Sequence, residues 1–221
     1  MARPKGARDA DYEEKRQELL RRMTLRVLRR ETARPSFRQL AQAAEVSVPT
    51  LRYYFGDRAS VIGAILENYL RDGLDRLERI ASPAGTFEES VREYGLALLM
   101  GFRAPRQVKL GDVFAIAIAE GLLDAEIGPA TLQFVIDPTL ESLQRRLSRH
   151  IARGEMRDVD TRAAALMLVS PLLLAILHQD HMGGSECNPA NLTAIIDEIC
   201  GAFVRAYSTP EVLAQSARLA G

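Results

Sequence analysis

Apolar residues recur at helical spacing along almost the whole chain. In the stretch "YEEKRQELLRRMTLRVLRR" (residues 12–30) they return every three or four positions, and arginines occupy the other face. This stripe predicts an amphipathic helix that ends before Pro35. Its apolar members are Leu19, Leu20, Met23, Val27 and Leu28.

Further helices are predicted downstream of this one. Two short helical patterns, "FRQLAQAA" and "VPTLRYYF", precede a long one, "RASVIGAILENYLRDGLDRLERI". Asp57 is placed to cap the long helix, and Gly56 just before it ends the preceding short helix. No segment alternates with a period of two, so we expect no sheet and an all-α fold. The remaining predicted helices are 87–102, 108–122, 131–152, 161–181 and 190–207, with a weaker pattern after Pro210.

The two short patterns lie between residues 37 and 55 and predict a helix-turn-helix. Helices of this length are unstable alone, so they must pack on each other and on the first helix. Ser47 falls at the N-cap of the second helix, and Pro49 lies in its first turn, where the missing N–H costs nothing. With Leu51 turned inward, apolar and aromatic groups are left on the outer surface of this helix.

Such a surface suits a recognition helix, which presents its N-terminal residues to base edges in the major groove. Val48 and Pro49 can meet thymine methyl groups, Thr50 can bond a base or a phosphate, and Arg38 can bind guanine. Short helices that pack on a third also occur in proteins that never meet DNA. The predicted DNA-binding residues are Arg38, Ser47, Val48, Pro49, Thr50, Arg52, Tyr53, Tyr54 and Arg58, the last at a helix N-terminus that attracts phosphate.

Charge is divided unevenly along a chain of zero net charge. Residues 1–58 hold 14 Lys and Arg against 8 Asp and Glu, and the remainder holds 15 against 21. The front segment is therefore basic and the rest acidic. A polyanionic partner for the front segment is favoured, although a basic solvated surface would look the same.

The stretch "FRQLAQAAEVSVPTLRYYFGDRASVIGAIL" resembles the DNA-binding region of the TetR family (TetR/AcrR type) of bacterial transcriptional regulators. The resemblance implies a three-helix DNA-binding domain at 1–56 and a larger helical effector-binding and dimerisation domain at 57–221, connected by a helix at 57–80. It also implies a homodimer that binds a pseudo-palindromic operator in double-stranded DNA and is released by a small-molecule effector. The residues that hold the family spacing are Leu40-Ala41, Val46-Ser47, Thr50-Leu51, the aromatic pair ending in Phe55, and Arg58.

Two positions depart from the family pattern. Where this chain has Glu45, the family usually has a glycine, so either Glu45 adopts a left-handed conformation or the turn differs. Where this chain has Arg52, the family usually has a tyrosine, which changes the geometry of a phosphate contact.

The helices predicted at 161–181 and 190–207 are strongly apolar, and a two-fold partner would bury the excess in a four-helix interface. Burial within one subunit is the alternative. The predicted interface residues are Leu166, Leu173, Leu177, Ile195 and Ile199.

An effector pocket is expected between helices of the same domain. Each candidate lining residue also fits an ordinary core position. Glu120 lies beside an apolar stripe and can bind a cationic ligand. The favoured interpretation is that Glu120 is a carboxylate at a helix end that faces solvent. The candidate pocket residues are Phe102, Phe114, Phe134, Met167 and His178.

His178 and His181 stand one helical turn apart and can begin a metal site, which leaves a helical metal-binding enzyme or sensor as the alternative function. Only two nitrogen ligands are visible, and no phosphate loop or nucleophile motif occurs. We therefore expect a regulator rather than an enzyme, with no cofactor and no metal.

The location is expected to be cytoplasmic. Cys187 and Cys200 form no disulfide framework, and no apolar stretch follows the basic N-terminal residues. The longest apolar run, residues 163–177, is shorter than the roughly 20 residues that a membrane span needs.

Overall fold

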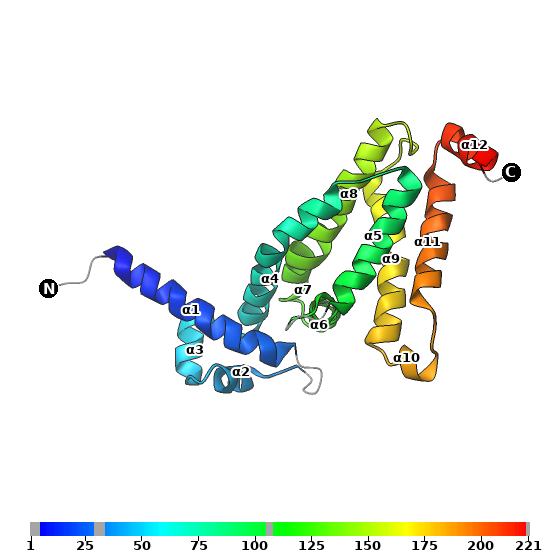
Figure 1. The fold of residues 1–221 in the computed structure, drawn as a ribbon. Helices are drawn as coiled ribbons and strands as arrows, with labels where there is room; N and C mark the ends of the chain where they lie inside the picture. The colour runs from blue at the N-terminus through cyan, green and yellow to red at the C-terminus, as the bar shows by residue number, and fades with distance from the viewer. Residues whose placement is uncertain (1–4, 29–33, 105–107, 220–221) are drawn as a thin grey trace. The chain divides into compact units, whose positions relative to one another are not determined.

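The computed structural model describes residues 5–28, 34–104 and 108–219, and these are almost entirely helical (Figure 1). The N-terminal helices are α1 (Lys5–Val27), α2 (Phe37–Ala43), α3 (Val48–Phe55) and α4 (Arg58–Ala81). They are followed by α5 (Phe87–Arg103), α6 (Leu110–Leu123), α7 (Gly128–Thr131), the π-helix η1 (Leu132–Ile136), α8 (Asp137–Ala152), α9 (Thr161–Asp180), α10 (Gly184–Cys187), α11 (Leu192–Tyr207) and α12 (Pro210–Leu219).

The expected all-α class is confirmed, since the described residues form no strand. Among these residues, one isolated antiparallel β-bridge joins Met156 and Ser208.

The chain folds into two compact units, which differ from the expected division at residue 56. The first unit contains the described residues up to Arg71 together with Ile116–Val135. The second contains Asp72–Ala115 and the described residues from Ile136 onward. Helices α4 and α6 therefore each contribute to both units, and the second half of α6 belongs with the N-terminal helices.

The core of the first unit is formed where α1, α2 and α3 pack together. Leu19 and Met23 of α1 are fully buried, as are Leu40 of α2 and Leu51 of α3. Burial of this shared core stabilises the two short helices, which are too short to persist alone.

The turn between α2 and α3 adopts the left-handed conformation at Glu45, whose φ is 58°. Arg22 of α1 holds this turn, because its guanidinium donates to the Ala44 carbonyl at 3.2 Å and to Glu45 Oε2 at 2.8 Å. Glu45 thus adopts the left-handed conformation that a glycine would adopt at this position.

In the second unit, α5 packs against α9 and α11, and α8 packs against α9 (Figure 1). A capping box starts α5, since the Glu89 amide donates to Thr86 Oγ1 and the Thr86 amide donates to Glu89 Oε2. Gly95 permits the close approach of α11, because a Cβ there would lie 2.7 Å from Ile196 Cγ2 and 2.8 Å from Cys200 Sγ.

The segment predicted as one helix at 131–152 is divided into α7, η1 and α8. Pro138, the second residue of α8, has no N–H to donate to the Phe134 carbonyl, so the regular α-helical ladder is interrupted there. The chain makes a wider π-turn before the proline instead.

Candidate nucleic-acid interface

Helix α3 begins at the predicted cap and presents its first turn outward. The Thr50 amide donates to Ser47 Oγ at 3.2 Å, and the two hydroxyls of Ser47 and Thr50 lie 2.7 Å apart. Pro49 is exposed, Val48 and Thr50 are half-buried, and Leu51 faces the core. The structure therefore brings Val48, Pro49 and Thr50 together on the accessible N-terminal turn of α3.

The three aromatic rings of α3 have different surroundings. Phe55 is buried, whereas Tyr53 is 71% exposed. Tyr54 is half-buried and stacks on Tyr12 of α1 with a centroid distance of 4.9 Å, and Tyr53 meets the same Tyr12 ring edge-on at 5.7 Å.

Sequence reasoning did not identify Tyr12 as part of this surface. The Tyr12 hydroxyl donates to the Tyr54 carbonyl at 3.4 Å. Tyr12 lies seven residues before Leu19 in the sequence, so it continues the apolar stripe of the first helix, and that periodicity was the available signal.

Two exposed arginines lie on the helix-turn-helix, one on α2 and one on α3. Arg38 is exposed in the first turn of α2. Arg52 is exposed on α3, and its guanidinium carbon lies 5.9 Å from the centre of the Phe37 ring, which orients this side chain by a cation–π contact.

The cap of α4 also follows the sequence prediction. The Ser60 amide donates to Asp57 Oδ1 at 2.8 Å, and this backbone hydrogen bond is the main cause that lowers the pKa of Asp57. Gly56, just before it, has a φ of 78°.

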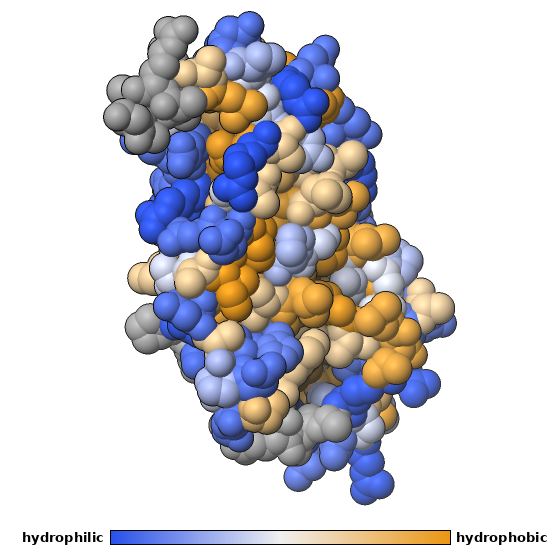
Figure 2. Space-filling model, turned by 90° about the vertical axis from the view of Figure 1, so that its right-hand side faces the viewer, coloured by the Kyte–Doolittle hydropathy of each residue, from blue (hydrophilic) through white to orange (hydrophobic). Residues whose placement is uncertain are grey.

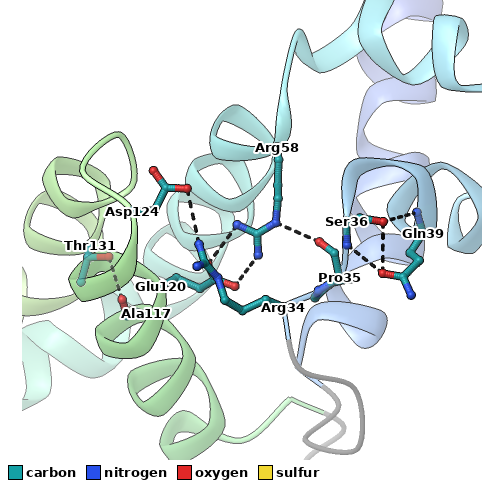
Figure 3. A network of polar contacts seen from close by, with 9 residues as sticks. All are labelled: Arg34, Pro35, Ser36, Gln39, Arg58, Ala117, Glu120, Asp124 and Thr131. Atoms are coloured by element: carbon teal, nitrogen blue, oxygen red, sulfur yellow. Dashed lines mark hydrogen bonds and ion pairs between the residues drawn. The ribbon is translucent and has the colours of Figure 1, made fainter.

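The structure corrects the expected role of Arg58. Instead of pointing to a phosphate, its guanidinium makes a two-pronged ion pair with Glu120 of α6, and Nε donates to the Pro35 carbonyl at 2.8 Å (Figure 3). A guanidinium bound in this way is held in a fixed orientation within the first unit.

Glu120 is the centre of this network and is also placed differently from the expectation. Its side chain is 4% exposed rather than facing solvent, and it accepts a second ion pair from Arg34 Nε at 3.0 Å (Figure 3). Arg34 also reaches Asp124 at 3.5 Å and has a positive φ of 36°. The cationic partners of Glu120 are therefore residues of this chain.

The second half of α6 is fastened to α7 in the same unit. Thr131 Oγ1 donates to the Ala117 carbonyl at 2.9 Å. A Cβ at Gly121 would lie 2.7 Å from Thr131 Oγ1, so glycine is needed for this approach.

Comparison with known proteins identifies the family. Residues 89–209, more than half of the chain, match the TetR-type C-terminal domain model described as "AefR-like transcriptional repressor, C-terminal domain". The chain belongs to the TetR family of transcriptional regulators. No curated protein has a matching sequence.

Solved structures of TetR-family proteins share the fold of this chain. A TetR-family regulator from Mesorhizobium loti is 19% identical with a TM-score of 0.66, and the match covers 90% of this chain and 98% of that one. SmeT, the repressor of the Stenotrophomonas maltophilia multidrug efflux pump SmeDEF, is 18% identical with a TM-score of 0.61 over 89% of this chain and 92% of that one. SmeT in complex with triclosan is 18% identical with a TM-score of 0.62, and the match covers 90% of this chain and 94% of that one.

In this TetR-family protein, two of the five candidate pocket residues lie together. Phe102 of α5 and Phe114 of α6 are buried, with ring centres 5.2 Å apart. Phe134 belongs to the first compact unit, whereas Phe102 and Phe114 belong to the second. Met167 is 63% exposed, so it does not line the interior of the subunit.

The two histidines lie against different elements, which does not favour a shared metal ion. His178 Nδ1 is 2.9 Å from Gln179 Nε2 and packs against Gly184 of α10. His181 packs against Gly111 of α6, and its Nε2 lies 3.5 Å from Asp112 Oδ1. Among the described residues, no group of three or more potential ligands surrounds a metal position.

One face of α9 is apolar and exposed in the single subunit. It follows the helical repeat through Ala163, Met167, Ser170 and Leu174, and Leu166 and Pro171 adjoin it. Figure 2, seen from the side on which Figure 1 draws α11, shows apolar residues gathered in a band between polar ones.

The predicted interface residues divide between this face and the core. Leu166 is exposed, and Leu173, Ile195 and Ile199 are half-buried. Leu177 is 7% exposed and packs inside the subunit, which corrects its assignment to the interface.

The α9 helix also has the length and composition of a membrane span, with a mean hydropathy of 1.7 over its most apolar stretch. One such helix is weak evidence for a membrane protein, because core and interface helices have the same composition.

Proposed function

We propose that this TetR-family protein is a homodimeric repressor that binds a pseudo-palindromic operator through α3 and is released by a small-molecule effector. The exposed first turn of α3, with Tyr53 beside it, carries this proposal. The cap at Ser47 fixes where the helix starts, so the residues that meet the groove are held on a rigid element.

The residues of the helix-turn-helix surface divide by role in this proposal. Val48, Pro49 and Thr50 meet base edges, and the Tyr53 hydroxyl donates to a phosphate oxygen. Arg52 contacts phosphate from its position over Phe37, and Arg38 reads guanine. Ser47 and Tyr54 support the surface, the first as a cap and the second through its stack on Tyr12.

Dimerisation supports operator binding because two recognition helices then read two half-sites about 34 Å apart. The exposed apolar face of α9 suits a two-fold interface, since it would otherwise expose Met167 and Leu174 to water. The half-buried Ile195 and Ile199 of α11 supply further apolar area.

The route from effector to DNA passes along α6 in this proposal. This helix carries Phe114, in the aromatic pair of the second unit, and Glu120, which binds Arg58 at the start of α4. An effector that shifts α6 changes the position of Glu120, and with it the DNA-competent arrangement of the first unit.

The proposal is tested by fluorescence anisotropy with a labelled duplex taken from the DNA that flanks the gene of this protein. Tyr53→Phe should weaken binding several-fold because one phosphate contact is lost. Tyr207→Phe, which removes a hydroxyl from α11, serves as the control. Equal affinities for wild type and Tyr53→Phe would remove Tyr53 from the interface, and no binding by the wild type would contradict the proposed function itself.

A further inference from the structure

Tyr94, in the middle of α5, has a buried hydroxyl without a hydrogen-bond partner. The residue is 1% exposed, and none of the residues that the structure describes donates to or accepts from its hydroxyl. Buried hydroxyls are normally paired, and an unpaired one is a net cost to folding. A group of this kind in the interior of a ligand-responsive domain therefore needs a reason.

The surroundings of Tyr94 come from three helices. One turn earlier on α5, Ser90 Oγ is 2.8 Å from both Arg146 Nε and His150 Nε2 of α8. Gly95, the next residue, is approached by Ile196 and Cys200 of α11. Along α5, Tyr94 thus stands between the paired polar group of Ser90 and the close apolar approach of α11 at Gly95.

The buried face of α5 continues from Tyr94 through Leu98 to Phe102. Phe102 packs on Phe114 of α6. This face carries one polar group at one end and an aromatic surface at the other, and all three side chains are buried in the free protein.

The protonation state of Tyr94 makes it a donor. Burial raises the pKa of the phenol well above its usual value, Arg146 opposes that shift and Cys200 adds to it. The hydroxyl is therefore protonated at every physiological pH and needs an acceptor oxygen.

The nearby charge favours a neutral ligand. The Arg146 guanidinium donates to Ser90 Oγ at 2.8 Å and to the Ile80 carbonyl at 3.0 Å, and it also forms an ion pair with Glu93. The charge of Arg146 is balanced by Glu93 and its three nitrogens are bonded, so a charged ligand beside Tyr94 would lose its hydration without gaining an unpaired partner of opposite charge.

We propose that Tyr94 is the polar anchor of the effector site, where its hydroxyl donates to a carbonyl or hydroxyl oxygen of a neutral, mostly apolar effector. The body of the effector packs along the face formed by Leu98 and Phe102. This inference rests on the proposed function, since it assigns the recognising group of the effector-binding domain. To admit the effector, the side chains that pack against this face in the free protein must move apart.

The first test uses unfolding in the absence of any ligand. Because the hydroxyl has no partner, Tyr94→Phe should leave the midpoint of thermal unfolding unchanged or raise it. A clear fall of the midpoint would show that the hydroxyl is already satisfied, by a bound water for example, and would overturn the proposal.

The second test uses two probes of nearly equal shape, acetylnaphthalene with a carbonyl oxygen and ethylnaphthalene without one. Calorimetric titration of the wild type should give roughly tenfold tighter binding of the ketone, the preference expected from one hydrogen bond. Tyr94→Phe should bind both probes equally, and Tyr207→Phe, the matched loss of a hydroxyl on α11, should keep the preference.

A ketone preference that survives in Tyr94→Phe, or its absence in the wild type, would overturn the assignment of Tyr94. DNA binding by both proteins without probe is measured in parallel. If the wild type binds DNA normally but does not prefer the ketone probe, this inference alone is contradicted. If the wild type does not bind DNA, the proposed function is contradicted.

Discussion

Glu120 of α6 accepts two hydrogen bonds from the guanidinium of Arg58, the first residue of α4, one of them at 3.0 Å to Oε2. The contact fastens the second half of α6 to the start of α4 within the first compact unit. Because both side chains are largely buried, the strength and geometry of the pair are protected from screening by salt.

Glu120→Gln should therefore destabilise the protein. A neutral amide leaves Arg58 without its anion and Arg34 with only the longer contact to Asp124, although it keeps one acceptor oxygen, so we expect a loss of about 2 kcal/mol in the free energy of unfolding. Urea unfolding measures it. Glu126→Gln, the same change at an exposed site, is the control, and identical midpoints for the two variants would show that the pair contributes no stability.

This network marks the limit of what the sequence could predict. Most of the helices and the caps at Ser47 and Asp57 follow from local patterns, because periodicity and capping depend on neighbouring residues. The sequence left open whether Glu45 is left-handed or the turn differs, and the structure decides for the first. The pair between Arg58 and Glu120 joins residues 62 positions apart, and no local pattern encodes such a contact.

The exposed surface of α3 was predictable because it follows from local periodicity and capping. The pocket and interface residues were less predictable. Apolar residues on an almost wholly apolar helix give no periodic signal. Leu177 and Met167 therefore look equivalent in the sequence, yet one is buried and the other exposed.

Arg38→Ala should weaken binding to the operator more than binding to random DNA. A bidentate contact to guanine contributes roughly 1 to 3 kcal/mol of discrimination, and only the specific complex makes it. Competition anisotropy with both duplexes measures the ratio. Arg79→Ala, an exposed arginine of α4, is the control, and equal losses on both duplexes would reassign Arg38 to phosphate.

Leu174→Glu should separate the proposed homodimer. Leu174 is exposed on the apolar face of α9, so a carboxylate there leaves the subunit core intact but places a charge in the interface. We expect the dimer dissociation constant to rise by roughly a hundredfold or more in sedimentation equilibrium. Met100→Glu, at an exposed apolar position of α5, should stay dimeric, and a fully dimeric Leu174→Glu would exclude this face.

Stability should fall in mild acid because of His150. Its side chain is fully buried, and burial lowers the pKa of the imidazole below its ordinary 6.5, although Glu155 opposes the shift. Charged groups near it also include Arg153 and Arg146, which lower the pKa further. The folded protein therefore holds His150 neutral in a range where the unfolded chain is protonated.

The free energy of unfolding should consequently decrease as the pH falls below about 6.5, by up to about 1.4 kcal/mol per pH unit from this group. Urea unfolding at several pH values measures the slope. His150→Gln should reduce it. An unchanged slope in His150→Gln would assign the acid sensitivity to other groups.

The most direct test of the central claim, that α3 and the basic N-terminal segment bind operator DNA, is a titration of the duplex that flanks the gene at rising salt concentrations. Residues 1–58 carry a net charge of +6, and phosphate contacts release counterions from DNA. We predict that the affinity falls by about a hundredfold or more between about 50 and about 200 mM salt. An affinity that does not change with salt, or no binding at any salt concentration, would contradict the account.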